Sequence, residues 1–98
     1  MSPDDAKRFA RRAEAAGLHY LDAPICGGSL KAESGDLTVM ASGTPAAFAA
    51  ARPVLGAIAA KLHELGPEAG IGASFKIVNQ LLAGVHIAAA CEAMAFAK

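Results

Sequence analysis

The stretch from Gly70 to Gln80 contains the residues of this chain whose types and spacing are best suited to chemistry. It places Lys76, Asn79 and Gln80 near the start of a long apolar run. Residues three and four apart share one face of a helix, so the ammonium and the two amides are expected to project together. A lysine held there with a partner can give or take a proton, as acid–base chemistry on a hydroxyl or a carbonyl requires. Composition alone favours the alternative of a solvated lysine, because most lysines near helix ends reach water.

Helices and strands alternate along the rest of the chain. Caps at Ser2 and Thr44, each followed by proline, predict one helix that runs to about Ala16 and a second over 46–60. The second helix is expected to break or restart at Pro53. Three short segments, 19–23, 37–41 and 61–65, predict strands, and Cys26-Gly27-Gly28 predicts a loop.

The last predicted helix starts near Ile71 and continues to the chain end. It would measure about 40 Å at 1.5 Å per residue, which is too long for a compact domain of this size. Asn79, Gln80, His86 and Glu92 interrupt the apolar run, so we expect a buried helix of a soluble protein and no membrane span. The order of elements predicts an α/β layer followed by a helix that leaves it, as in a piece of a larger protein.

Composition excludes several classes of partner. Nine basic and nine acidic residues give a formal net charge of zero, which provides no electrostatic attraction for nucleic acid. The two cysteines, Cys26 and Cys91, have no CxxC spacing and no signal-like segment precedes them, so we expect a reduced, cytoplasmic protein without disulfides. The histidines are far apart in the sequence, so no metal is expected.

Two motifs together resemble the β-hydroxyacid dehydrogenase family, which includes 3-hydroxyisobutyrate dehydrogenases, tartronate semialdehyde reductases and L-threonate dehydrogenases. Residues 22–28, Asp-Ala-Pro-Ile-Cys-Gly-Gly, followed by 35–40, are similar to the family's substrate-binding signature and the strand after it. Gly70-x-Gly72-x-x-x-Lys76-x-x-Asn79-Gln80 is similar to its catalytic-lysine signature. The residues that follow, 81–94, most resemble the threonate dehydrogenase branch.

The resemblance implies a fold, a domain division and a cofactor. Residues 1–69 would be the C-terminal portion of a Rossmann-type domain that binds NAD or NADP, and residues 70–98 would be the interdomain helix that begins an all-helical domain. That helical domain would complete the site and form a homo-oligomer. The Gly-x-Gly-x-x-Gly fingerprint that holds the pyrophosphate is absent from this chain, so no cofactor-binding residue is identified here.

The resemblance also implies a role for each motif. Lys76 would exchange the hydroxyl proton with a small hydroxy acid, and Asn79 or Gln80 would hold the substrate by amide hydrogen bonds. Backbone N–H groups at Cys26-Gly27-Gly28 would bind the substrate carboxylate. The family usually has serine where this chain has Cys26, so one side-chain hydrogen bond is weakened.

Three other residues have structural interpretations. Asp22 is expected to order the turn at Pro24, Cys91 to be a small core residue, and His86 to lie in a core or an interface, with the edge of the site as its alternative. Cys26 as a nucleophile is disfavoured, because no histidine is placed to activate it.

Two functional hypotheses follow. The first is a fragment of an NAD(P)-dependent oxidoreductase that acts on a small β-hydroxy acid and is inactive as the isolated fragment. The alternative is a non-catalytic module, either truncated or reused for assembly through its long helix, whose apolar surface a lone copy would expose.

Overall fold

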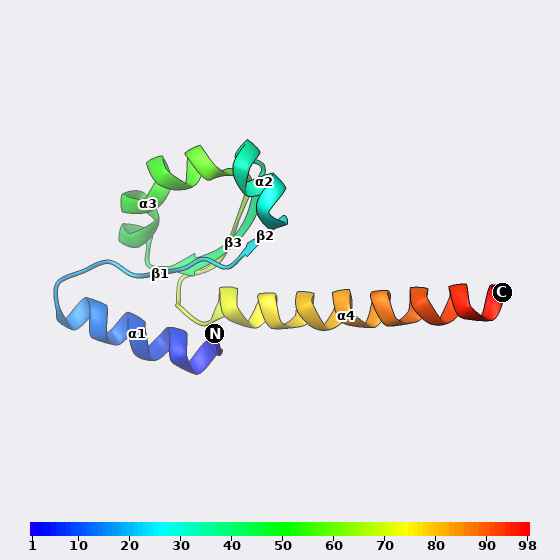
Figure 1. The fold of residues 1–98 in the computed structure, drawn as a ribbon. Helices are drawn as coiled ribbons and strands as arrows, with labels where there is room; N and C mark the ends of the chain where they lie inside the picture. Colours follow the sequence, from blue (N-terminus) through cyan, green and yellow to red (C-terminus); the bar gives the residue numbers. More distant parts are fainter.

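A computed structural model describes residues 1–98 as a small sheet flanked by helices, with one long helix extending away from it (Figure 1). The elements are α1 (Pro3–Ala15), β1 (Leu21–Asp22), β2 (Ile25–Cys26), α2 (Gly28–Ser34), β3 (Leu37–Gly43), α3 (Pro45–Ile58), β4 (Ala59–Gly66) and α4 (Ile71–Ala97). The radius of gyration is 16.2 Å and the longest extent is 59 Å. A compact domain of this length has a radius of gyration of about 13 Å, so α4 makes the molecule elongated.

Strand β3 lies at the centre of the sheet. β4 pairs with it in parallel, and both β1 and β2 pair with it antiparallel, at opposite ends of β3. β1 and β2 act as one strand interrupted at Ala23 and Pro24, where Pro24 O still accepts a hydrogen bond from Met40 N. The interruption lets one segment of chain run along the whole of β3 with a local change of direction.

Helix α3 connects β3 to the parallel strand β4 and covers one face of the sheet (Figure 1). Val39 and Ala41 of β3 pack there against Phe48 and Leu55 of α3 and form the largest buried cluster. These strand residues alternate with Met40 and Ser42, as side chains on opposite faces of a strand must. Helix α1 and the first turns of α4 lie on the other side of the sheet (Figure 1).

The start of α4 is bound to the sheet by three hydrogen bonds from its own backbone. Asp22 Oδ2 accepts from Gly70 N at 2.8 Å and from Ala73 N at 2.9 Å, and Ser42 Oγ accepts from Gly72 N at 2.9 Å. The first N–H groups of a helix have no partner within the helix, and a carboxylate is favourable at that positive end. The expectation that Asp22 orders the turn at Pro24 is wrong, because its carboxylate binds α4 instead.

The two glycines of the Gly70-x-Gly72 motif allow this close approach. Gly70 has φ of +102°, a conformation that residues with a side chain rarely adopt. A Cβ on Gly72 would lie 2.6 Å from Met40 O and 2.8 Å from the Asp22 backbone O. The motif therefore serves helix–sheet packing, and its N–H groups are already occupied by Asp22 and Ser42.

The α/β class with a long final helix is confirmed, but the sequence missed two elements. α2 begins at Gly28, where only a loop was expected after Cys26, and β2 was also missed. α3 runs without a break through Pro53, which lies on the exposed side of the helix, where water can bind the carbonyl group that proline leaves free. The ends of β1, β3 and β4 differ from the predicted segments by at most two residues, as expected of sequence patterns.

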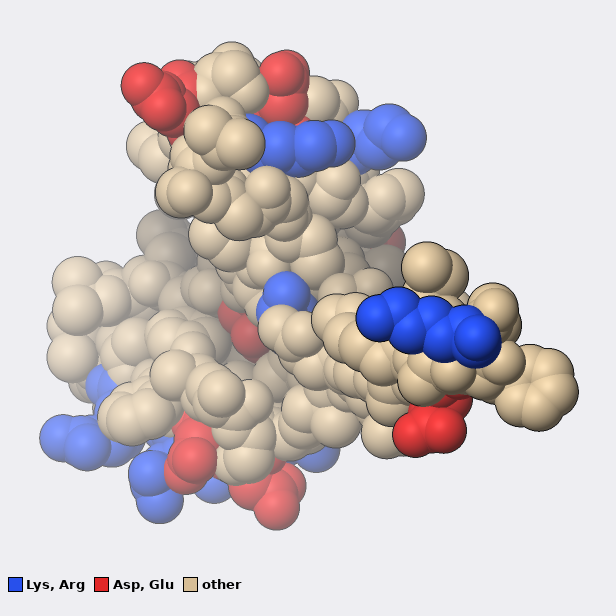
Figure 2. Space-filling view, turned by 45° about the vertical axis from the view of Figure 1, so that its right-hand side comes forward, with Lys and Arg blue, Asp and Glu red and all other residues tan.

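The apolar run at the end of the chain forms the expected helix, but the expectation that this helix is buried is wrong. Helix α4 is long and apolar enough to cross a membrane by length and composition, a test that core helices of soluble proteins also pass, and none of its most apolar stretch is buried. Figure 2 shows the projecting helix as a ridge with few charged side chains. Cys91 and His86 are exposed rather than buried. The rest of α4 is exposed because α1 and the sheet contact only its first turns, and no other part of the chain reaches it.

Tyr20, the one tyrosine of the chain, lies just before β1, and its pKa reflects the packing near Asp22. Burial is the main cause that raises the pKa of the Tyr20 phenol above 10.0, and the Asp22 carboxylate raises it further. The phenol is neutral at physiological pH, and its hydroxyl contacts Met1 Sδ at 3.6 Å.

Replacing Gly72 by alanine is expected to lower the free energy of unfolding, because the new Cβ meets the carbonyls of two strands. Overpacking of this kind costs about 1–3 kcal/mol. Gly84→Ala is the matched control: nothing lies within 4 Å of a Cβ there, and alanine is favoured in a helix by up to about 1 kcal/mol. Urea unfolding followed by circular dichroism measures both variants. Equal stabilities for Gly72→Ala and the parent chain would contradict the close packing of α4.

The Tyr20 phenol is expected to titrate above its ordinary pKa in the folded chain and at that value in urea, as measured by the ultraviolet absorbance of the phenolate. A raised pKa in the folded state means that stability is fully present below about pH 10 and is lost as the pH rises through the folded pKa. Tyr20→Phe should lose less stability over this alkaline range than the parent chain. An ordinary midpoint in the folded chain would refute the burial of the ring.

Candidate functional site

Lys76 is the sixth residue of α4 and points toward β2. Its Nζ donates a hydrogen bond to Ile25 O at 2.8 Å and lies 3.3 Å from Cys26 Sγ. The side chain is half-buried, so its ammonium is held against the sheet and is not simply solvated. The structure thus supplies the partner that a lysine near the start of an apolar helix needs.

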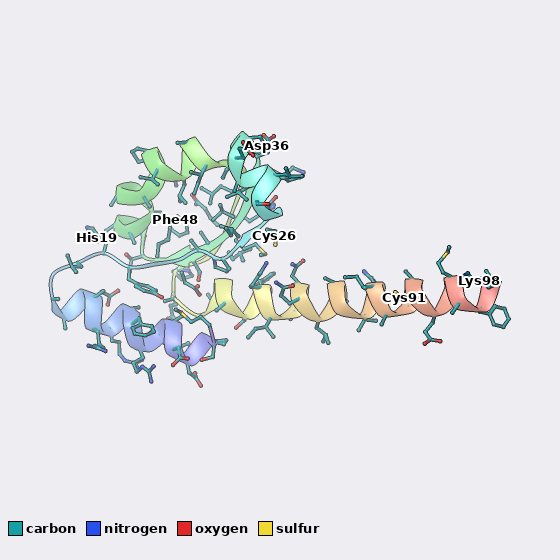
Figure 3. All side chains as sticks on the ribbon, in the orientation of Figure 1. His19, Cys26, Asp36, Phe48, Cys91 and Lys98 are labelled. Carbon is teal, nitrogen blue, oxygen red and sulfur yellow. The ribbon has the colours of Figure 1, made fainter.

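Asn79 reaches the same sulfur from one turn further along the helix. Its Nδ2 donates to Cys26 Sγ at 3.3 Å. Figure 3 shows Cys26 on the strand directly beside α4. The spacing of three places Lys76 and Asn79 on one face, and both converge on a cysteine about fifty residues earlier in the chain.

Gln80 does not join this group. It is exposed, and its side chain makes no hydrogen bond to Cys26 or to any other residue. The rotation of the helix therefore separates the two amides that the sequence placed together: Asn79 faces β2, and Gln80 faces solvent.

Gly27 and Gly28 form the junction between β2 and α2. Both are exposed and have positive φ, +135° and +71°. A Cβ on Gly27 would lie 2.8 Å from Lys31 Cβ, whereas one on Gly28 would meet nothing. No side chain caps the start of α2, so its first N–H groups are left free next to Cys26.

A cavity of about 260 Å³ lies beside Lys76. Its eight lining residues come mainly from the segment around β1 and include Tyr20, Asp22 and Ala73. A cavity of this size can hold only a small molecule or part of one. The Lys76 side chain therefore has a space on one side and the Ile25–Cys26 backbone on the other.

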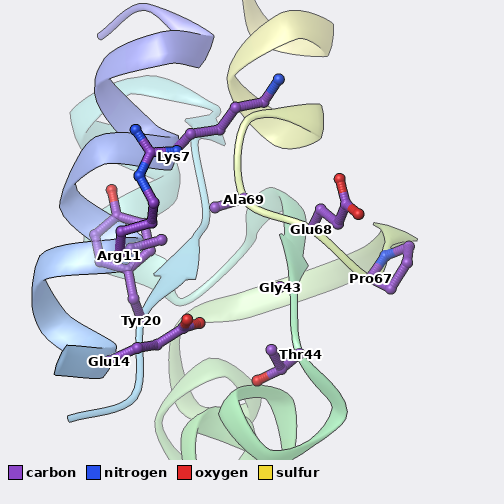
Figure 4. A pocket seen from close by; sticks show the side chains of 10 residues that line it. Lys7, Arg11, Glu14, Tyr20, Gly43, Thr44, Pro67, Glu68 and Ala69 are labelled. Carbon is purple, nitrogen blue, oxygen red and sulfur yellow. The ribbon is translucent and has the colours of Figure 1, made fainter. Parts of the chain in front are cut away.

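A second cavity, of about 320 Å³, lies between α1 and the segment that joins β4 to α4 (Figure 4). It is lined by charged side chains of both signs, including Lys7, Arg11, Glu14 and Glu68, and by none of the predicted site residues. The structure also contains no group of three or more His, Cys, Asp or Glu side chains placed to hold a metal ion.

Sequence reasoning missed Ser42 and misassigned Asp22, the two side chains that hold the helix carrying Lys76. No local pattern identifies them, since each binds a residue at least 30 positions away. The polar Ser42 at the end of a buried apolar strand was the one available signal, because a buried hydroxyl normally has a hydrogen-bond partner.

Known proteins resemble this chain over most of its length. Residues 1–66 match the family described as the NAD binding domain of 6-phosphogluconate dehydrogenase. An L-threonate dehydrogenase of Pectobacterium atrosepticum is 54% identical over 97 residues, which are 99% of this chain and 32% of that protein. The chain thus spans about a third of the length of the curated relatives it matches.

Solved structures show the same similarity. The crystal structure of a 3-hydroxyisobutyrate dehydrogenase from Salmonella typhimurium matches 98% of this chain and 34% of its own, with 51% identity and a TM-score of 0.93. A structure of Psf3 in complex with NADP⁺ and 2-OPP matches 97% of this chain and 33% of its own, with 29% identity and a TM-score of 0.90. The resemblance that the two motifs indicated is confirmed: the chain belongs to the family of the NAD binding domain of 6-phosphogluconate dehydrogenase, and its relatives include L-threonate and 3-hydroxyisobutyrate dehydrogenases.

Proposed function

We propose that this chain is the part of an NAD(P)-dependent oxidoreductase that supplies the proton-transfer lysine and a portion of the substrate site. The single observation that carries the proposal is the convergence of Lys76 and Asn79 on Ile25 and Cys26, which joins the two family motifs in space. The names of the relatives support a small β-hydroxy acid as substrate, of the threonate, 3-hydroxyisobutyrate or tartronate semialdehyde type.

The proposal divides the chain in two. Residues 1–69 form the end of the nucleotide-binding domain, and residues 70–98 form the helix that leads into a helical domain. The family match over residues 1–66 and the projection of α4 away from the sheet support this division. An apolar helix with no cover in this chain also supports assembly as a homo-oligomer through that second domain. A cytoplasmic location is supported by the relatives, which are dehydrogenases of bacteria.

These 98 residues do not fit a nicotinamide cofactor by themselves. The chain contains no Gly-x-Gly-x-x-Gly segment, and the N–H groups of Gly70 and Gly72 already bind Asp22 and Ser42. Three of the first N–H groups at the start of α4, those of Gly70, Gly72 and Ala73, are therefore occupied and do not serve a pyrophosphate. We assign cofactor binding to residues outside this chain, and the hydride chemistry is that of the cofactor.

In the proposed reaction, this chain supplies the proton transfer and part of the substrate binding. Lys76 Nζ is held near the cavity by Ile25 O. When the hydroxy acid is oxidised, the neutral amine takes the hydroxyl proton and becomes the ammonium; when the carbonyl is reduced, the ammonium returns that proton to the oxygen. Asn79 donates a hydrogen bond to the substrate or to Cys26. The free N–H groups at Gly27 and Gly28 bind the substrate carboxylate, and Gln80 is the weaker of the two amide candidates because it faces solvent.

A non-catalytic module used for assembly is the second candidate, and the bare apolar surface of α4 favours it. Size-exclusion chromatography of the chain together with a nicotinamide titration separates the two. A well-folded oligomer without cofactor affinity supports the module, whereas an aggregated or loosely folded chain supports a part separated from its partner regions.

The coding sequence upstream of Met1 is expected to continue in frame with a strand, a Gly-x-Gly-x-x-Gly segment and a helix. The protein expressed with that region should reduce NAD⁺ or NADP⁺ in the presence of L-threonate or 3-hydroxyisobutyrate, which absorbance of the reduced cofactor measures. A start codon at Met1 with no such region upstream would refute the proposal for this gene product.

Lys76→Ala in that longer protein is expected to lower kcat/KM between about a hundredfold and ten-thousandfold, because proton transfer loses its donor and acceptor. The dissociation constant of the cofactor should stay unchanged in a fluorescence titration. Lys61→Ala is the control, since Lys61 is exposed on β4. Retained turnover in Lys76→Ala would remove Lys76 from its proposed role.

A further inference from the structure

The place of the Lys76 ammonium depends on where α4 starts and in which direction it leaves the sheet. Lys76 is only five residues after Ile71, the first residue of the helix, so it lies within about 8 Å of the start at 1.5 Å per residue. The N-cap residue, Gly70, has no side chain with which to cap the helix. Whatever fixes the first turn therefore comes from elsewhere in the chain.

Asp22 and Ser42 provide that attachment. They accept hydrogen bonds from three N–H groups at the start of α4, those of the N-cap residue Gly70 and of Gly72 and Ala73 in the first turn, at 2.8–2.9 Å. Both side chains are removed from solvent, with 6% of Asp22 and 0% of Ser42 exposed. Neither has another hydrogen-bond partner that would explain a buried polar side chain at its position.

The attachment also fixes how α4 is aligned with the segment that it faces, residues 22–26. Asp22 lies on the same interrupted strand as Ile25 and Cys26, the residues that Lys76 contacts. One short segment therefore holds the start of α4 with its Asp22 side chain and contacts Lys76 three and four residues later, at Ile25 O and Cys26 Sγ. Gly72 brings the helix into backbone contact with both strands, which leaves little freedom for the helix to shift.

We propose that Asp22 and Ser42 are positioning residues, which fix the Lys76 ammonium against Ile25 O and Cys26 by holding the first turn of α4. Neither side chain contacts the ammonium itself. The consequence for turnover rests on the proposed function of Lys76, whereas the consequence for its position does not. A displacement of about 1 Å in a reacting group can lower a rate by as much as a hundredfold.

The position of Lys76 is measured directly by nuclear Overhauser contacts between the side chains of Lys76 and Cys26 in the longer protein, isotopically labelled at lysine and cysteine. Asp22→Ala and Ser42→Ala should lose these contacts, and Asp22→Asn should keep part of them because its amide oxygen still accepts. Thr44→Ala is the matched control: Thr44 Oγ1 caps α3 by accepting from Ala47 N, so the variant loses a helix cap on a helix that does not carry Lys76. It should keep the contacts.

In the longer protein, Asp22→Ala and Ser42→Ala should lower kcat by about tenfold to a hundredfold with an unchanged KM for the cofactor, and Thr44→Ala should leave kcat unchanged. If Asp22→Ala does not fold, Ser42→Ala still tests the proposal, since it removes one bond only. Contacts as strong in Ser42→Ala and Asp22→Asn as in the parent would overturn the proposal. Full turnover in both Asp22→Ala and Ser42→Ala, with Lys76→Ala inactive, would also overturn it. Full turnover in Lys76→Ala would instead refute the proposed function, and loss of the contacts would still support the positioning role.

Discussion

The hydrogen bonds that Asp22 and Ser42 accept from the start of α4 are the constraint on which the rest of this structure depends. They satisfy N–H groups that no helix can satisfy from within, and they do so at a point where glycine lets the backbones touch. A helix attached only by side-chain packing could rotate or slide by fractions of a turn. Three directional bonds remove that freedom, and Lys76, Asn79 and Gln80 then have fixed directions.

That fixed rotation explains why two adjacent amides have different surroundings. Successive residues on a helix are about 100° apart, so only one of Asn79 and Gln80 can face β2 when Lys76 does. Cys26 receives both donors, and a sulfur is a weak acceptor, which leaves the ammonium and the amide available to a better acceptor such as a carboxylate or an alkoxide. A bound carboxylate or alkoxide would make stronger hydrogen bonds with both groups than the sulfur does.

Local signals in the sequence were sufficient for much of the fold. The Ser2 and Thr44 caps started their helices where predicted, and the apolar segment at 37–41 became the central strand. The partner of Ser42 was beyond reach, because Gly72 lies 30 residues further along the chain. α2 was missed although it is local, because its start at Gly27-Gly28 was expected to be a loop. The exposure of α4 was anticipated only by the alternative hypothesis of a lone copy. The pair of motifs was readable as a family resemblance, but only the folded chain shows that Gly70 and Gly72 serve packing and that Lys76 meets Cys26.

The length of α4 has a mechanical consequence. The helix is attached at one end only, so it behaves as a lever whose pivot is the Gly70–Gly72 turn. At 1.5 Å per residue, a tilt of about 5° would move Ala97 by about 3.5 Å but Lys76 by only about 0.7 Å. Motion applied at the far end of the helix would therefore reach Lys76 reduced about fivefold, so its ammonium keeps its place against Ile25 O while the tip of the helix moves.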